Sequence, residues 1–513
     1  MFIGSNIFAG RSALSALTGS VLFTGAAHAT VVISSGQTAN MSCSGGVCAP
    51  TSADAVLNAG DLKTFLVSGS VEVTTTASGV QADNIEVSTA LSWSSTATLI
   101  LDAYDSIAVD KPIFVKGEGG LSFVTNDGGT TGTLSFGENG KARFANLSSS
   151  LTINRRPYTL VNGIEALAAA IGDDPSGKYA VADDYDASAD GDYNGSPIPA
   201  LLNGTVEGLG NAISNLTITV KADNAQIGLF SGVGTDGAVD DLGLVAVNVK
   251  VSGDDDAVGG FAGSNGGSLV GDFIQGNVIG GQLGTTGAYT GGLVGNSSGS
   301  ISNSHANVSV RAKSRTYVGG LVGAQPGGAI VNSYAVGNVT GQNACTGGLA
   351  GYAGTISTSF ATGKVTGRNG ALGGLAGCGG GGTISNSYAT GMSGSRNGGI
   401  SGGLIGNDLY GGHSGGGITS SYSAGDVSGS KTSILGGFAG EVENSGAATN
   451  DYWNVTTSST NQGVGDGSSS GIAGLTNKQF RSGLPAGFDP AIWAEKHGIN
   501  GGLPYLLANP PPK

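Results

Sequence analysis

The chain has 513 residues, of which 96 are glycine, 39% are hydrophobic and only 11% are charged. A glycine share far above the usual ~7%, without a Gly-x-y period, excludes collagen, and the apolar, weakly charged composition excludes a disordered chain. The formal net charge of −14, with 22 Lys and Arg scattered along the sequence, argues against a nucleic-acid partner. We therefore expect an ordered, β-rich protein in which glycine serves tight turns.

An export signal is predicted at residues 1–29. Arg11 precedes an apolar run, and Ala27-His28-Ala29 has the small-residue pattern of a cleavage site. No later stretch reaches the ~20 apolar residues of a membrane helix, so no membrane span is expected after cleavage. The expected location is outside the cell, either secreted or at the cell surface.

Four cysteines follow the signal. Cys43 and Cys48 flank a flexible Ser-Gly-Gly-Val loop, and in an exported chain this spacing predicts a local disulfide. Cys345 and Cys378 lie in neighbouring repeats, one before a Gly-Gly pair and the other after it. Because these positions differ, we expect their side chains not to meet and to remain buried thiols.

The composition changes along the chain define five segments. Residues 1–29 are the signal, and residues 30–160 alternate as short strands in an N-terminal β-rich region. Residues 161–200 hold a short helix, from 163 to 171, and an acidic loop. Residues 201–450 form the repeat region. Residues 451–513 contain a Ser/Gly-rich linker and a cap, which we expect to close the open end of the repeats.

Two motifs recur in fixed order in the repeat region, with successive copies 26 to 34 residues apart. The first, Gly-Gly-[Leu/Phe]-[Val/Ala/Ile]-Gly, begins at Gly259, Gly291, Gly319, Gly347, Gly373, Gly402 and Gly436. The second runs from an isoleucine to an aromatic residue, and a valine follows at Val310, Val339, Val365 and Val427, with Met392 expected at that place in the shorter copy. Internal repeats of this period are typical of solenoids.

Each unit has three short apolar segments separated by Gly, Ser and Asn, and it cannot bury its apolar face alone. If the units stack along an axis, each strand pairs with its counterpart one coil away, at about 4.8 Å, and identical residues form columns. The sequence therefore predicts an all-β fold, a parallel β-helix of glycine-rich coils with a short helix and a C-terminal cap.

Three columns are predicted from the second motif. The interior column is Ile301, Ile330, Ile356, Ile384 and Ile418; the aromatic column is His305, Tyr334, Phe360, Tyr388 and Tyr422; and an amide ladder at a turn is Asn303, Asn332 and Asn386. The aromatic column could serve as a sugar-binding platform, but ladders that simply stabilise stacked coils are the favoured interpretation.

The repeat unit, as in Gly319-Gly320-Leu321-Val322-Gly323, resembles the GLUG motif of bacterial surface proteins. The segments 99–115 and 151–158 are similar to filamentous haemagglutinin-type adhesins of Gram-negative bacteria. Together the resemblance covers most of the exported chain. It implies a right-handed parallel β-helix displayed outside the cell, often for adhesion, with an outer-membrane secretion partner.

The chemistry expected of this chain is limited. A His-Glu-x-x-His zinc motif is absent, and His305, His413 and His497 lack metal-ligand spacing, so no metal site is predicted. Two acidic clusters, Asp183, Asp184, Asp186, Asp190 and Asp192 and then Asp254, Asp255 and Asp256, leave open whether calcium binds there or whether they are solvated turns.

We therefore expect an exported protein without catalytic residues or cofactors that adheres to a cell-surface receptor, the matrix or a glycan. One alternative is a polysaccharide-acting lyase or glycosidase, because other parallel β-helices carry such activities. That chemistry needs converging carboxylates, whereas the acids of the repeats, chiefly Asp408 and Asp426, occupy unrelated positions. The other alternative is an inert surface scaffold. The binding residues themselves cannot be read from the motifs.

Overall fold

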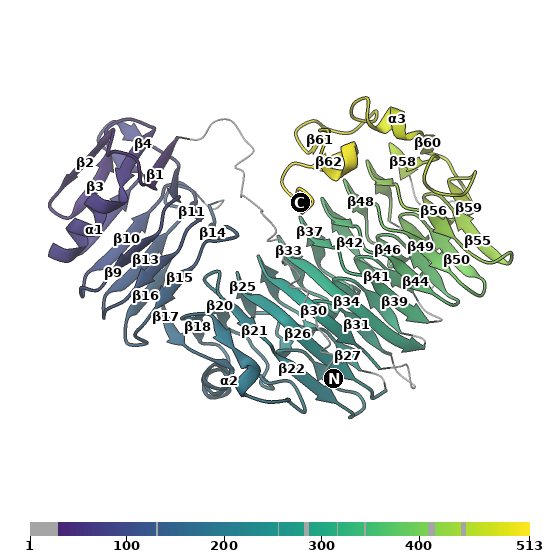
Figure 1. The fold of residues 1–513 in the computed structure, drawn as a ribbon, viewed down its shortest axis with the longest axis horizontal. Helices are drawn as coiled ribbons and strands as arrows, with labels where there is room; N and C mark the ends of the chain where they lie inside the picture. Colours follow the sequence, from purple (N-terminus) through teal and green to yellow (C-terminus); the bar gives the residue numbers. More distant parts are fainter. Residues whose placement is uncertain are drawn as a thin grey trace, which may run out of the picture.

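The computed structural model describes residues 29–512, apart from residues 130–131, 255, 282–286, 315, 343–344, 409–415 and 443–447. Residues 1–28 of the predicted signal (1–29), and Asp255 and His413, lie outside this part. Figure 1 shows two stacks of strands joined at an angle, which we call the N-terminal limb (residues 30–160) and the C-terminal limb (residues 161–475). Strands of successive coils pair in parallel along each limb, so the predicted parallel β-helix is confirmed.

The N-terminal limb has three sheets around one apolar core. Their strands are β4 (Ala55–Asn58), β1 (Thr30–Ser34), β8 (Asn84–Val87), β11 (Ile107–Val109) and β14 (Leu134–Phe136); β2 (Met41–Ser44), β3 (Val47–Pro50), β5 (Val71–Thr74), β10 (Thr98–Asp102), β13 (Gly120–Val124) and β16 (Ser150–Ile153); and β9 (Leu91–Trp93), β12 (Ile113–Val115) and β15 (Ala142–Phe144).

A helix that we did not predict closes the start of this limb. Helix α1 (Ala59–Ser68) begins at Asn58, whose side chain accepts hydrogen bonds from the backbone of Gly60 and Asp61. Leu62 and Leu66, four residues apart, are fully buried against the core. The buried face of α1 spans only about two helical turns, so its apolar spacing in the sequence is too short to be told apart from that of the surrounding strands.

The limbs meet at a hairpin that reverses the strands. Strand β16 pairs antiparallel with β17 (Arg156–Val161), and the turn residues Asn154 and Arg155 both have positive φ, 50° and 63°. On β17, Leu160 packs into the core of the N-terminal limb and Val161 into that of the C-terminal limb. The strands reverse direction at this hairpin, and the core moves to the opposite face of the sheet. Because both changes occur together, the two limbs wind with the same hand. The angle in Figure 1 lies at this joint.

Four sheets surround the core of the C-terminal limb. The isoleucine sheet contains β17, β18 (Lys178–Val181), β20 (Thr205–Glu207), β25 (Ala238–Asp240), β29 (Ser268–Val270), β33 (Ser300–Ser302), β37 (Ala329–Val331), β42 (Thr355–Ser357), β47 (Ile384–Ser385), β52 (Ile418–Thr419) and β57 (Ala448–Thr449). The aromatic sheet contains β19 (Tyr185–Asp186), β21 (Ala212–Ser214), β22 (Thr217–Val220), β26 (Gly243–Val251), β30 (Phe273–Ile279), β34 (His305–Ser314), β38 (Tyr334–Ala335), β39 (Val339–Gln342), β43 (Phe360–Ala361), β44 (Val365–Gly367), β48 (Tyr388–Ala389), β49 (Ser393–Ser395), β53 (Tyr422–Ser423), β54 (Val427–Ser428), β58 (Asp451–Asn454) and β60 (Ile472–Leu475).

The remaining two, the glycine sheets, flank the Gly-Gly motif. The first contains β23 (Gln226–Ile227), β27 (Ala257–Val258), β31 (Tyr289–Gly291), β35 (Tyr317–Gly319), β40 (Thr346–Gly347), β45 (Ala371–Gly373), β50 (Gly399–Gly402) and β55 (Ser433–Gly436). The second contains β24 (Phe230–Val233), β28 (Ala262–Asn265), β32 (Val294–Ser297), β36 (Val322–Ala324), β41 (Ala350–Ala353), β46 (Ala376–Gly379), β51 (Ile405–Asn407), β56 (Ala439–Val442) and β59 (Val464–Gly467).

The glycine pair is required by the tight turn between these sheets. A Cβ on Gly319 would lie 1.9 Å from the carbonyl oxygen of Val322, and one on Gly320 would lie 2.1 Å from that of Gly348 in the next coil. Both contacts are with backbone that cannot move aside, so the motif permits backbones to approach where any side chain would clash.

The core consists of the columns that the repeats place in register. The five isoleucines of the second motif pair in sequence and are at most 5% exposed. Val310, Val339 and Val365 form a parallel column as well, but Val365 pairs with Ser393 rather than Met392, so the expectation for Met392 is wrong. The buried hydroxyl of Ser393 is accommodated because it donates to the carbonyl of Gly402 at 2.8 Å.

The ends of the C-terminal limb are covered differently from our expectation. Helix α2 (Ile164–Asp173) lies where the helix was predicted and buries Ile164, Leu167 and Ile171 at the start of the core. The last segment, residues 476–512, does not close the far end. It runs back along the outside of the aromatic sheet, from Tyr452 to Thr358, and we call it the strap (Figure 1).

Candidate functional site

The three asparagines of the predicted amide ladder hold the same turn position in their coils, and a serine ladder runs beside them. The Asn332 side chain accepts a hydrogen bond from the Thr358 hydroxyl of the next coil. Asn303, Asn332 and Asn386 sit at a turn with positive φ, 51°, 49° and 46°. Asparagine tolerates this conformation, which explains its presence. Thr358 and Ser420 hold the same turn position in two further coils, with φ of 44° and 50°. The serine that follows each of these five positions is buried, donates to the carbonyl two residues back, and accepts the backbone N–H of its counterpart in the preceding coil. This applies to Ser304, Ser333, Ser359, Ser387 and Ser421.

An aspartate occupies each end of the serine ladder. Asp272 accepts the backbone N–H of Leu242 at 3.0 Å, and Asp451 accepts that of Ser421 at 2.9 Å. Both are completely buried, and burial raises the pKa of Asp451 to about 7 and that of Asp272 well above its ordinary range. The second oxygen of Asp272 has no hydrogen-bond partner in the described structure. The ladder is therefore neutral in its middle and acidic at its ends.

The aromatic column forms as the register requires. Ring centroids are 4.7 Å apart between His305 and Tyr334, and 4.8 Å between Tyr334 and Phe360. Phe360 and Tyr388 are 4.8 Å apart, Tyr388 and Tyr422 are 5.1 Å apart, and these rings lie within 10° of parallel. Burial lowers the pKa of His305 to about 4, so this histidine is a neutral member of the stack near pH 7.

This stacking argues against a sugar platform, because sugars pack on ring faces and here each face is covered by its neighbour. Phe273 extends the column beyond His305, with centroids 5.4 Å apart, and its other face lies on the glycine backbone of Gly243. Only ring edges point outward. The strap covers those of Phe360, Tyr388 and Tyr422, which are fully buried.

Specific hydrogen bonds hold the strap on the column. The hydroxyl of Tyr422 donates to the carbonyl of Pro504 at 2.6 Å and accepts from the Asn500 amide at 2.7 Å. The indole of Trp493 donates to the Asn386 side chain at 3.2 Å. Hydrogen bonds to Tyr422 and Asn386, as well as apolar contacts, therefore hold the strap on the aromatic column.

Two adjacent tyrosines under the strap make a matched test. The hydroxyl of Tyr388 is buried without a hydrogen-bond partner, so Tyr388→Phe is expected to stabilise the chain by about 1 kcal/mol. Tyr422→Phe removes two bonds and leaves Asn500 and Pro504 only the bond that they make with each other, so it is expected to destabilise by about 1–3 kcal/mol. Denaturant unfolding of both variants measures the difference. Equal effects would contradict this assignment of partners.

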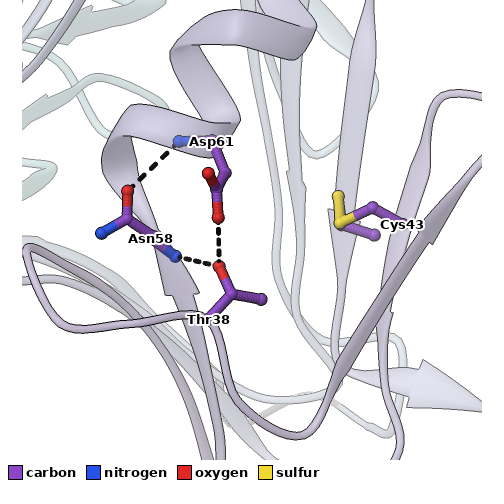
Figure 2. Close-up of a disulfide and its surroundings, with 5 residues drawn as sticks. Thr38, Cys43, Asn58 and Asp61 are labelled. Carbon is purple, nitrogen blue, oxygen red and sulfur yellow. Dashed lines mark hydrogen bonds between the residues drawn. A yellow bond between two sulfur atoms is a disulfide. The ribbon is translucent and has the colours of Figure 1, made fainter.

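The structure joins Cys43 to Cys48 by a disulfide across the β2–β3 hairpin. Figure 2 shows this bridge beside the start of α1, where the Thr38 hydroxyl donates to the Asp61 carboxylate at 2.6 Å and accepts the Asn58 backbone N–H. The hairpin and the segment after α1 line a surface pocket of about 290 Å³. This region is a cap in which the disulfide fixes an edge hairpin.

The expectation of two thiols at Cys345 and Cys378 is wrong, because the structure joins them by a disulfide. The strand before Gly-Gly in one coil lies directly against the strand after Gly-Gly in the next: a Cβ on Gly377 would be 2.4 Å from the backbone nitrogen of Thr346. The Cα atoms of the two cysteines are therefore 5.4 Å apart. The bond links consecutive coils across the two glycine sheets.

The carboxylates of the first acidic cluster have separate protein partners. Asp183 and Asp184 pair with Arg143 and Lys141 of the N-terminal limb, each with an N–O distance of 2.6 Å, and so tie the two limbs together. Asp190 accepts from the hydroxyls of Tyr185 and Tyr193, at 2.6 and 2.8 Å. Asp186 accepts from Asn215 at 2.8 Å, while Asp192 is exposed. These carboxylates therefore do not converge on one point.

A second acidic group, which we did not predict, is buried just after the joint. Glu207 and Asp240 are register neighbours in the isoleucine sheet, and Asp241 follows directly. Burial raises the pKa of Asp240 to about 6. Burial, and after it repulsion from the neighbouring carboxylates, also raises the pKa values of Glu207 and Asp241 well above their ordinary range. Glu207 is only 5% exposed and accepts the backbone N–H of Leu209 at 3.0 Å.

The described residues contain no group of three or more His, Cys, Asp and Glu placed to hold a metal ion. His305 is in the aromatic column, and His497 is exposed on the strap. Asp408 is buried, with its pKa raised by burial to about 7, while Asp426 is half-buried in the aromatic sheet, on a different face. Within the described ranges, no helix has the length and apolar character needed to cross a membrane.

Polar side chains form the exposed columns on the aromatic sheet. Register aligns Asn248 with Asn277 and Ser309, and Asn338 follows one coil later. All four are exposed. This column presents hydrogen-bonding side chains to solvent in four successive coils.

No protein-family model matches this chain, and no curated protein is similar to it in sequence. Among solved structures, a crystal structure described as a "putative immunoglobulin A1 protease" from Bacteroides ovatus aligns with 69% of this chain and 93% of its own. The sequence identity is 17% and the TM-score is 0.35.

Proposed function

We propose that this chain is an exported, non-catalytic surface or secreted protein that adheres to cells, matrix or glycans through the outer face of its aromatic sheet. The observation that carries the proposal is the exposed polar column of Asn248, Asn277, Ser309 and Asn338. A solenoid multiplies one weak contact along its axis, and many such contacts give firm attachment. The two disulfides favour export, since they persist in oxidising compartments.

One observation favours an enzyme instead. Glu207 and Asp240 lie side by side with raised pKa values, and paired carboxylates of this kind are what glycosidases use. However, Glu207 is buried and its oxygen is held by the backbone of Leu209, so a sugar cannot reach it without opening the joint. We assign the pair to the joint between the limbs rather than to catalysis.

The test is binding of the purified full chain to panels of cells, matrix proteins and glycans. Saturable binding is expected, without release of reducing sugar from any polysaccharide. Binding to none of these surfaces by folded protein would favour an inert scaffold. Release of reducing sugar that is lost in Glu207→Gln would overturn the non-catalytic assignment.

A further inference from the structure

The basic residues of the repeats gather on one face. Every described Lys and Arg between residues 243 and 431 lies in the aromatic sheet or within three residues of one of its strands, and all are exposed. They are Lys250, Arg311, Lys313, Lys364, Arg368, Arg396 and Lys431. We call this set the basic stripe. It follows β26, β34, β44, β49 and β54 along the limb, as Figure 1 shows for the labelled strands.

The register explains why residues scattered in the sequence become a stripe. Lys250 pairs with Ile279, which pairs with Arg311, and Arg311 pairs with Thr340 one coil further. Arg396 donates its backbone N–H to the carbonyl of Gly367, beside Arg368. The repeat period therefore places charges from distant parts of the sequence in neighbouring coils.

The charge of the stripe is positive, whereas the net charge of the whole chain is −14. Residues 243–431 contain eight Lys and Arg and six Asp and Glu, whereas the whole chain has 22 and 36. Of the acids in this segment, Asp256, Asp272 and Asp408 are buried. Lys250 and Arg311 form no ion pair with any of the described residues. The face thus presents positive charge to solvent.

The charge spacing distinguishes the anionic polymers that could bind. Seven cations over seven coils average about one charge per 4.8 Å, with two each in the coils of β34 and β44 and none in those of Ile279 and Thr340. Double-stranded DNA carries a charge every ~1.7 Å, and single strands are held by aromatic faces, which this stripe lacks. A polyuronate carries one carboxylate per sugar ring, a spacing close to that of the coils. The Asn and Thr side chains between the cations can bond its hydroxyls.

We propose that the basic stripe binds an acidic polysaccharide with one carboxylate per sugar ring, lying along the axis of the limb. The inference rests on the proposed adhesive function and names its ligand class. Lys and Arg supply the attraction, and the polar columns beside them, including Asn277, Ser309 and Thr340, supply hydrogen bonds to the sugar hydroxyls.

The test uses the full chain and polygalacturonate at low and moderate salt. Reversing three charges, Arg311→Glu with Lys313→Glu and Lys364→Glu, is expected to weaken binding on the order of a hundredfold, since each cation near an anionic surface contributes about fivefold. Wild-type binding should fall steeply with salt. The matched control, Lys111→Glu with Lys116→Glu and Arg156→Glu, changes the net charge equally at exposed sites of the N-terminal limb and should bind like the wild type.

Two further probes separate the alternatives. Fully methyl-esterified polygalacturonate should not bind, because its carboxylates are neutral. Tighter binding of duplex DNA than of polygalacturonate would overturn the proposal in favour of nucleic acid, and equal loss in both triple variants would overturn the assigned face. A wild-type chain that adheres to cells, matrix or other glycans but ignores polygalacturonate would refute this inference alone, whereas a folded chain that binds none of these surfaces, polygalacturonate included, would refute the proposed function as well.

Discussion

Trp493→Ala is expected to release the strap while the solenoid remains folded, with a local loss of about 3–5 kcal/mol. Trp493 is 1% exposed, and its ring centroid lies 4.6 Å from that of Phe488 and about 6 Å from those of Tyr388 and Tyr422. The loss is local because the strap and the column rings form a cluster separate from the interior core.

Hydrogen exchange and limited proteolysis measure this result. Amides of residues 476–512 should lose protection in Trp493→Ala, while those of β33 and β37 keep it. Lys496→Ala, an exposed change on the same segment, serves as the control and should leave both regions protected. Loss of protection across the whole C-terminal limb would show that the strap is part of one cooperative core.

The second large effect is a loss of stability as the pH rises. The folded chain holds protons on buried carboxyls that the unfolded chain releases above about pH 4, because burial raises their pKa values in the fold. The stabilisation is complete below the unfolded pKa and is lost as the pH rises through the folded one. For Asp451, a shift to about 7 corresponds to about 4 kcal/mol between pH 4 and pH 8. His305, whose pKa is lowered, acts oppositely below pH 6.5.

Asp272→Ser isolates one of these groups. Serine fills the same position in the next coil at Ser304, so the variant extends the serine ladder and removes a carboxylate oxygen that has no partner. It is expected to gain about 1–3 kcal/mol at pH 8 and much less at pH 4. Ser333→Asp, which places an acid in the middle of the ladder, should do the reverse. Thermal unfolding at both pH values measures this, and a gain that is independent of pH would contradict it.

The repeat region was predictable because the sequence period fixes the strand register: equivalent residues of successive repeats pair with each other. Once the coils stack, Ile301 must meet Ile330, and His305 must meet Tyr334. The serine ladder had a signal as well, since a serine follows every turn position, but its role depends on a backbone N–H one coil away. The basic stripe was missed because its members, such as Lys250 and Arg311, become neighbours only through the register.

The joint and the second disulfide were not predictable by the same reasoning. The β16–β17 hairpin occurs once, in a region without repeats, and its consequence depends on Leu160 and Val161 facing different cores. The Cys345–Cys378 bond depends on how closely the two glycine sheets approach, which the position within the repeat does not reveal. The strap has no counterpart among the repeats, so its path along the aromatic column required the structure.

The most direct test of the account is adhesion of the intact chain to cells whose surface carries uronic-acid polysaccharide. Wild type, the triple charge reversal at Arg311, Lys313 and Lys364, and the matched control at Lys111, Lys116 and Arg156 are compared at equal concentration. The account predicts saturable binding by wild type and control and loss in the stripe variant. Equal binding by all three, or none by folded wild type, would contradict it.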